Sequence, residues 1–214
     1  EEPLSDRAIA LTRDVVLVHG DSLIVAYYHS TCGGWTANVE DVWNKPYIPY
    51  LRSVPDVGPD GTAYCAPSRY FHWRETWSTR RFSDIISGYA ATAFPHEEPL
   101  KGAVRRVRVD RRFACGRVAH CTISTTRGSY SYGGDRVRFL LRRDTDGRPI
   151  LRSASFRLKD EERGKITLVG RGYGHGVGMC QMGAIGRAQA GQDFEEILSA
   201  YYTGARPERI VHKR

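Results

Sequence analysis

The sequence predicts an α+β fold in which antiparallel sheets and hairpins combine with a few short helices. Short runs of β-branched and aromatic residues alternate with polar residues and are bounded by turn residues, as is typical of antiparallel strands. Near the C-terminus, a glycine-rich loop precedes two stretches with helical periodicity. The chain has 214 residues, 41% of them hydrophobic, and no internal repeat or clear linker. We therefore expect a single domain over residues 1–214.

The first third of the chain predicts a hairpin followed by two loops. Strands are expected at Val15–Val18 and Leu23–Tyr28, with turn residues between them. The small-residue loop His29–Gly34 follows, at a strand end where functional side chains are often placed. Residues 37–67 are proline-rich and without periodicity, which predicts a long surface loop. Its aromatic residues either stack on sugars or fix the loop to the core: Trp43, Tyr47 and Tyr50.

The middle of the chain predicts a strand, a helix and a three-stranded meander. Phe71–Trp77 alternates large and polar residues like a half-buried strand, and residues 78–86 start with helix-capping residues. A turn is expected at Gly133–Gly134. The meander strands are expected at Val104–Asp110, Val118–Thr126 and Arg136–Arg142.

The last third predicts two paired strands, the glycine-rich loop and two helices. The first four of these elements are expected at Phe156–Leu158, Lys165–Val169, Gly170–Gly178 and Met179–Ala188. The second helix, over residues 194–201, starts with a capping box formed by Asp193 and Glu196.

The net charge of +8 comes from arginines scattered through the expected strands and turns. This pattern favours either a broad basic face that attracts polyanions or a merely solvated surface. No nucleic-acid motif accompanies the charge, so we expect no nucleic-acid partner. No stretch approaches the roughly 18 apolar residues of a membrane span. The N-terminus lacks a signal-peptide pattern, which leaves a cytoplasmic chain or a processed piece as alternatives.

The sequence has five cysteines and no CxxC pair, which disfavours a zinc ribbon. One hypothesis is a disulfide across the turn between Cys115 and Cys121, with a second between Cys32 and Cys65. The alternative is a metal site, for example for zinc, formed by Cys32, Cys65 and Cys180 with His29 or His175. The spacing of these residues in the sequence does not match a known metal motif and gives this alternative no support.

The glycine-rich loop contains one histidine, His175, with Gln181 one to two helical turns further on. An imidazole among glycines is either open to a bulky ligand or buried and satisfied by hydrogen bonds. A phosphate loop is excluded, because GxxxxGK[ST] and a parallel βαβ unit are both missing. A serine hydrolase is also disfavoured despite Ser30 and His29, because there is no GxSxG motif and no orienting acid.

Cleavage of a glycosidic bond requires a carboxylic acid with a raised pKa. The best-placed acids are Glu40 and Asp41, which directly precede Val42 and Trp43. An aromatic wall there would desolvate them. The alternative is that they cap the loop or form ion pairs in it.

Two long motifs combine these features. The first comprises Tyr28–Thr36, Glu40–Trp43 and Pro49–Asp56, and the second comprises Gly172–Ala184, Glu196–Leu198 and Tyr201–Gly204. In this order they resemble the stage II sporulation protein D (SpoIID) family, which includes LytB-type amidase enhancers, over about residues 8–210. Cysteine stands at positions 32 and 180, where sporulation members often have serine.

The resemblance implies an extracytoplasmic enzyme that cleaves peptidoglycan between N-acetylmuramic acid and N-acetylglucosamine and leaves a 1,6-anhydro end. This lytic transglycosylation needs no cofactor and uses one glutamate as acid and then base. The family's glutamate lies upstream of the matching residues, so we expect activity only with that segment. The alternative is a non-catalytic peptidoglycan-binding or amidase-enhancing module with an amidase or other wall-remodelling partner. The expected groove residues are His29, Ser30, Thr31, Gly33, Gly34, Trp43, Tyr173, His175 and Gln181.

Overall fold

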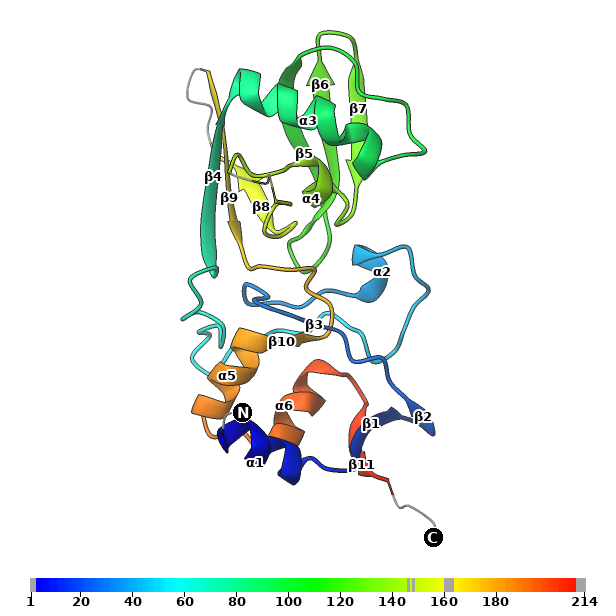
Figure 1. Cartoon of the computed structure of the whole chain (residues 1–214), viewed down its shortest axis with the longest axis vertical. Coiled ribbons are helices and arrows are strands. Elements are labelled where there is room, and N and C mark those ends of the chain that lie inside the picture. The colour runs from blue at the N-terminus through cyan, green and yellow to red at the C-terminus, as the bar shows by residue number, and fades with distance from the viewer. Residues whose placement is uncertain (1–2, 146, 148, 160–163, 211–214) are drawn as a thin grey trace.

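The computed structural model describes residues 3–145, 147, 149–159 and 164–210. It confirms the α+β class, with antiparallel sheets and short helices. The molecule is elongated and has two lobes (Figure 1). We call residues 72–171 the upper lobe and the segments on either side of it, in sequence, the lower lobe. Each lobe has its own hydrophobic core.

In its described residues, the upper lobe contains two three-stranded antiparallel sheets and two helices. One sheet has the order β4-β9-β8 and the other the order β5-β6-β7. The strands are β4 (His72–Ser78), β5 (Val104–Arg112), β6 (Val118–Thr125), β7 (Ser129–Gly133), β8 (Phe156–Leu158) and β9 (Lys165–Arg171). The helices are α3 (Thr79–Ala93) and α4 (Val137–Leu140).

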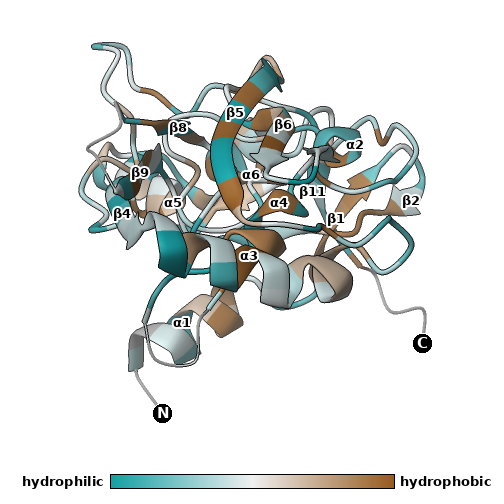
Figure 2. Cartoon of the chain, turned by 90° about the horizontal axis from the view of Figure 1, so that it is seen from above, coloured by the Kyte–Doolittle hydropathy of each residue, from teal (hydrophilic) through white to brown (hydrophobic). Residues whose placement is uncertain are grey.

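Helix α3 covers the upper core. Ser78 caps it by accepting a hydrogen bond from the Arg81 N–H. Its buried side chains Phe82, Ile85 and Ile86 lie on one face, because residues three and four apart share a helix face. Hydrophobic and hydrophilic residues also alternate along β5 (Figure 2), so that one side of this strand packs inward.

The lower lobe is built from both ends of the chain. One sheet has the order β11-β1-β2, and β3 pairs with β10 in parallel. The strands are β1 (Val15–His19), β2 (Ser22–Leu23), β3 (Tyr28–His29), β10 (Met179–Cys180) and β11 (Arg206–Arg209). The helices are α1 (Pro3–Leu11), α2 (Val39–Val42), α5 (Gln181–Gln189) and α6 (Phe194–Tyr201). No helix in the described ranges is long and apolar enough to cross a membrane.

Most predicted elements are confirmed, including the capping box of α6. Two strand predictions are wrong. The expected strand Arg136–Arg142 contains helix α4, because Val137, Leu140 and Leu141 are all buried and have helical spacing. The third meander strand is β7 instead. Leu23–Tyr28 pairs with β1 only over β2, and the chain then turns away to meet β10.

Candidate functional site

The two sequence motifs meet where the lobes join. Strands β3 and β10 pair in parallel, with Tyr28 opposite Met179 and His29 opposite Cys180. A second contact joins Thr31 to Tyr173 through two backbone hydrogen bonds. The loop after β3 and the glycine-rich loop before β10 therefore form one surface, as the resemblance implies.

Two histidines lie side by side at this junction. The His29 and His175 ring centroids are 5.5 Å apart. Nδ1–H of His29 donates to the Val177 carbonyl oxygen at 3.2 Å. In His175, Nε2–H donates to the Tyr28 carbonyl oxygen at 3.0 Å, and Nδ1 accepts the Val177 N–H at 3.1 Å. Burial lowers both pKa values below the ordinary histidine range, so both rings are neutral.

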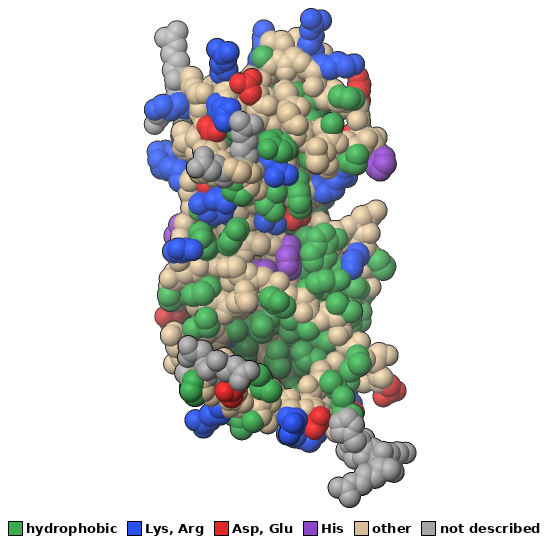
Figure 3. All heavy atoms as spheres, viewed as in Figure 1, with side chains coloured by type: hydrophobic (Ala, Val, Ile, Leu, Met, Phe, Trp, Pro, Cys, Tyr) green, Lys and Arg blue, Asp and Glu red, His purple; other side chains and the backbone are tan. Residues whose placement is uncertain are grey.

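An aromatic wall extends from His175. The Trp43 ring centroid lies 4.9 Å from that of His175 and 4.9 Å from that of Tyr27. The Lys45 ammonium lies over both Tyr27 and Trp43 and donates to the Tyr27 hydroxyl at 2.7 Å. The space-filling view shows histidine side chains in the middle of the molecule, beside a hydrophobic surface (Figure 3). These contacts fix the long loop to the core at Trp43, which is one of the two roles considered for this residue.

The upper lobe contributes a buried arginine that sequence reasoning missed. Arg117 donates to the Gly174 carbonyl oxygen at 3.3 Å. Its guanidinium lies over Gly176, where a Cβ would come within 2.4 Å of it and where φ is +89°. Only glycine therefore accommodates this packing. Nearby, the buried Arg138 pairs with Asp135 at 2.9 Å. No sequence motif marked any of these charged residues.

The other expected groove residues are spread around the junction. Thr31 is buried and bonds the Ser68 hydroxyl at 2.9 Å, so it supports the loop from inside. Tyr173 packs its ring on Tyr70 at 4.7 Å. Gln181 is exposed at the start of α5, and Ser30 is half-buried.

The two candidate acids of this chain differ in environment. Glu40 forms an ion pair with Arg52, whose Nη2 lies 2.5 Å from its carboxylate. Asp41 accepts a hydrogen bond from the Asn38 amide at 3.0 Å. Burial raises the pKa of Asp41.

A cleft of about 750 Å³ opens beside Gly33, on the upper-lobe side of the junction. Its floor is the sheet β4-β9-β8, in which Arg74, Val169 and Arg157 lie opposite one another across three strands and share one face. Arg112 and Arg171 add two more positive charges, and no Asp or Glu lines the cleft within the described part of the chain. The lining residues also include the aromatic residues Trp35, His72, Trp73 and Phe156. Apart from Gly33, sequence reasoning did not connect these residues with a site.

Neither predicted disulfide is present, since all five cysteines are free thiols. Cys121 points into the upper core from β6, whereas Cys115 packs against the lower core, so the expected bridge between them is wrong. The sulfur atoms of Cys32 and Cys65 lie 3.5 Å apart, well beyond the S–S bond length of about 2.05 Å. The expected bond between these two is therefore absent as well.

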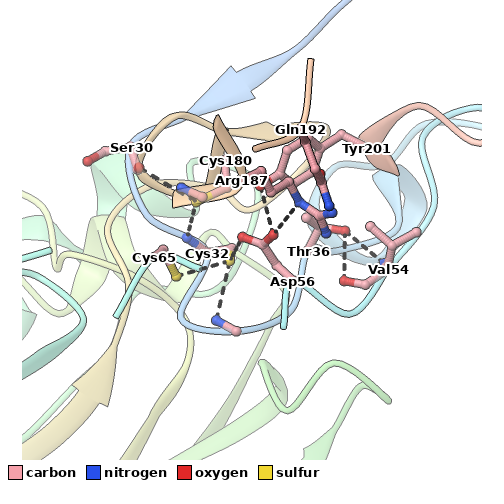
Figure 4. Close-up of polar contacts among 12 residues, drawn as sticks. Ser30, Cys32, Thr36, Val54, Asp56, Cys65, Cys180, Arg187, Gln192 and Tyr201 are labelled. Carbon is pink, nitrogen blue, oxygen red and sulfur yellow. Dashed lines mark hydrogen bonds and ion pairs between the residues drawn. The ribbon is translucent and has the colours of Figure 1, made fainter. Parts of the chain in front are cut away.

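Three cysteines nevertheless gather beneath the junction. Cys32, Cys65 and Cys180 are buried together with Asp56 (Figure 4), and their ligand atoms all lie within 4.8 Å of one another. The fourth side chain is thus Asp56, not His29 or His175. Hydrogen bonds from the neighbouring thiols and from the N–H groups of Gly33 and Gly34 lower the pKa of Cys65.

The two joined motifs are those of the SpoIID and amidase-enhancer resemblance, and comparison with known proteins supports this resemblance. The chain is 28% identical to stage II sporulation protein D of Bacillus subtilis over 197 residues, which are 92% of this chain and 49% of that protein. It is 27% identical to the amidase enhancer of B. subtilis over an alignment of 235 positions, which covers 94% of this chain and 32% of that protein. An uncharacterized protein of Brachyspira hyodysenteriae is 27% identical over 205 residues, 93% of this chain and 47% of that protein.

A family model described as "Domain of unknown function (DUF8618)" matches residues 61–178, which is more than half of the chain. The chain belongs to this family. It spans between about a third and a half of the length of the three relatives above.

Proposed function

We propose that this chain binds the glycan strands of peptidoglycan outside the cytoplasm, as part of a domain that cleaves them by lytic transglycosylation. The observation that carries the proposal is the arginine-lined cleft beside Gly33. It borders the first motif shared with the SpoIID family. Two relatives with names that refer to sporulation and to amidase enhancement support a role in the cell wall.

The chemistry of the cleft suits a carboxylate-bearing polysaccharide. Guanidinium groups bind carboxylates through paired, charge-assisted hydrogen bonds. Arg74 and Arg157 flank Val169 on one sheet face, so they present two such groups to one ligand. Trp35 is half-exposed at the edge and offers a flat apolar surface for a sugar ring.

The acid for cleavage has two candidate sources. The resemblance assigns it to a glutamate upstream of the matching residues. Within this chain Asp41 is the alternative, because its pKa is raised by burial while Glu40 is held in an ion pair. This pairing of Glu40 favours the second candidate function, a peptidoglycan-binding or amidase-enhancing module that needs a partner for bond cleavage.

Binding is tested by pelleting the chain with insoluble peptidoglycan. Changing both Arg74 and Arg157 to Gln should weaken binding at least about tenfold, since one lost charge-assisted hydrogen bond is worth about 1.5–3 kcal/mol. Changing the exposed Arg80 and Arg105, which do not line the cleft, to Gln is the matched control for charge. If both double variants lose the same amount of binding, the loss comes from the change in net charge, and the assignment of binding to the cleft is contradicted.

Cleavage is tested by mass spectrometry of soluble products released from purified glycan strands, with and without stem peptides. The chain is assayed alone and joined to the glutamate-bearing upstream segment of the sporulation relative. Anhydromuramic ends only from the joined form support an upstream acid. If the chain alone releases them and Asp41→Asn abolishes the release, the acid is Asp41. Tight binding without products from either form supports the binding module.

A further inference from the structure

The buried cluster of three cysteines and one aspartate has the composition of a metal site. Cys32 lies in the loop after β3, Cys65 in the long loop and Cys180 at the N-terminus of α5, with Asp56 beside Cys32 (Figure 4). All four side chains are at most 3% exposed. Their ligand atoms come from positions 32, 56, 65 and 180 of the sequence, and the fold brings them within 4.8 Å of one another.

Two of the separations between these atoms are close to those of a tetrahedral zinc site. Two thiolates on one zinc, each about 2.3 Å from the metal, are about 3.8 Å apart. The Cys32 and Cys65 sulfurs are 3.5 Å apart, and Asp56 Oδ2 lies 3.2 Å from the Cys32 sulfur. The atoms of these two pairs would need to move apart by about 0.3 Å to hold an ion.

The carboxylate is already oriented toward the sulfur atoms. Asp56 Oδ1 accepts hydrogen bonds from Arg187 Nε at 3.0 Å and from the Tyr201 hydroxyl at 2.7 Å. Oδ2 is thereby left facing Cys32. Outer hydrogen bonds that fix one oxygen of a ligating carboxylate are typical of metal centres. Gly183 completes the fit, because a Cβ there would lie 2.1 Å from Oδ2.

Backbone N–H groups point at the sulfur atoms. The N–H of Cys32 donates to the Cys180 sulfur at 3.1 Å, and that of Gly183 donates to it at 3.2 Å. The N–H of Gly34 donates to the Cys32 sulfur at 3.3 Å. A sulfur atom that binds a metal accepts hydrogen bonds of this kind from its surroundings.

We propose that Cys32, Cys65, Cys180 and Asp56 bind one zinc ion in a closed, structural site. Soft thiolates with one carboxylate suit zinc, whereas calcium and magnesium require oxygen ligands and the common iron–sulfur clusters require four cysteines. Four protein ligands complete the tetrahedron, so the ion holds segments together. It ties the loop after β3 to the long loop and to α5, directly beneath the two histidines. This site does not depend on the proposed action on glycan.

The metal content of the intact chain tests this proposal. The protein is purified with added Zn²⁺ and without chelator, and its metal is measured by inductively coupled plasma mass spectrometry. About one zinc per chain is expected, falling at least about tenfold in Cys65→Ser and unchanged in Cys115→Ser, a partly buried thiol outside the cluster. Replacement of zinc by Co²⁺ in the unaltered chain should give the visible absorption of a tetrahedral thiolate site, which avoids reliance on a variant that fails to fold.

Three results would overturn the proposal. The first is a substoichiometric zinc content with all five thiols free after Zn²⁺ is supplied. The second is an equal loss of zinc in Cys65→Ser and Cys115→Ser. The third is an intact mass two hydrogens lighter together with a Cys32–Cys65 peptide link in the unreduced protein, which would assign the pair to a disulfide.

Discussion

Two helical glycines should respond to alanine in opposite ways. Gly183 lies in α5, where a Cβ would be 2.1 Å from Asp56 Oδ2 and 2.3 Å from the Tyr201 hydroxyl. Gly88 lies in α3, where a Cβ would meet nothing within 4 Å. Neither residue has a positive φ, so backbone strain plays no part in the comparison.

The size of each effect follows from these contacts. Alanine is better than glycine by about 1 kcal/mol inside a helix, so Gly88→Ala should stabilise the fold by up to that amount. Gly183→Ala gains the same term but overpacks the core, which costs about 1–3 kcal/mol. It must also displace Asp56 from the Tyr201 hydroxyl, and a hydrogen bond to a charged group is worth about 1.5–3 kcal/mol. A net loss of roughly 2–5 kcal/mol is expected for Gly183→Ala.

Urea unfolding followed by tryptophan fluorescence and far-ultraviolet circular dichroism measures both changes. The two variants should move the midpoint in opposite directions without changing the slope. If Gly183→Ala is as stable as the unaltered chain, the packing of Asp56 and Tyr201 against α5 is not as described. If Gly88→Ala is destabilised instead, the helix-propensity reasoning fails for α3.

Three further changes test the charged and titratable residues. His175→Gln should reduce the loss of unfolding free energy between about pH 7.5 and about pH 5.5. Burial lowers the pKa of His175 in the folded state, so the unfolded state takes up a proton first as the pH falls through about 6.5, and the folded state loses stability. An unchanged pH profile of the unfolding free energy would contradict this reasoning. Arg138→Met should cost about 3–5 kcal/mol in urea unfolding, because it leaves Asp135 buried and unpaired. Arg81→Met removes the partner of Asp144 in a much more exposed ion pair and should cost less than about 1 kcal/mol. Similar losses of unfolding free energy in the two arginine variants would contradict the expectation that burial sets the cost of breaking each pair.

Local patterns predicted most of the fold. Strands β4, β5, β6, β8 and β9 and helices α3, α5 and α6 all lie where periodicity or capping residues placed them. The errors occur where tertiary partners decide the outcome. Val137, Leu140 and Leu141 fit a strand or a helix by composition, and burial against the upper core selects the helix. Val25 is exposed and lies where the chain leaves β1 to reach a strand more than 150 residues away.

The candidate site was predictable only in part. The motifs correctly indicated that the loop after β3 and the glycine-rich loop form one surface, because the resemblance carries that information. A cluster of Cys32, Cys65 and Cys180 was one of the two alternatives for the cysteines. The sequence could not identify Asp56 as the fourth member, because the orientation of its carboxylate depends on Arg187 and Tyr201 in the last two helices. The arginines of the cleft come from separate strands, and only their register makes them neighbours.

The order in which the two cores close follows from the chain path. The upper lobe is entered at His72 and left at Arg171, and these two residues lie opposite each other in the sheet, so the whole lobe is a continuous excursion from the lower one. The lower core needs residues from both sides of that excursion, including Leu51 and Tyr201. During synthesis on the ribosome, the upper lobe can therefore fold while the lower one waits for its last segment. The groove is assembled only after the segment that contains Tyr201 has been made.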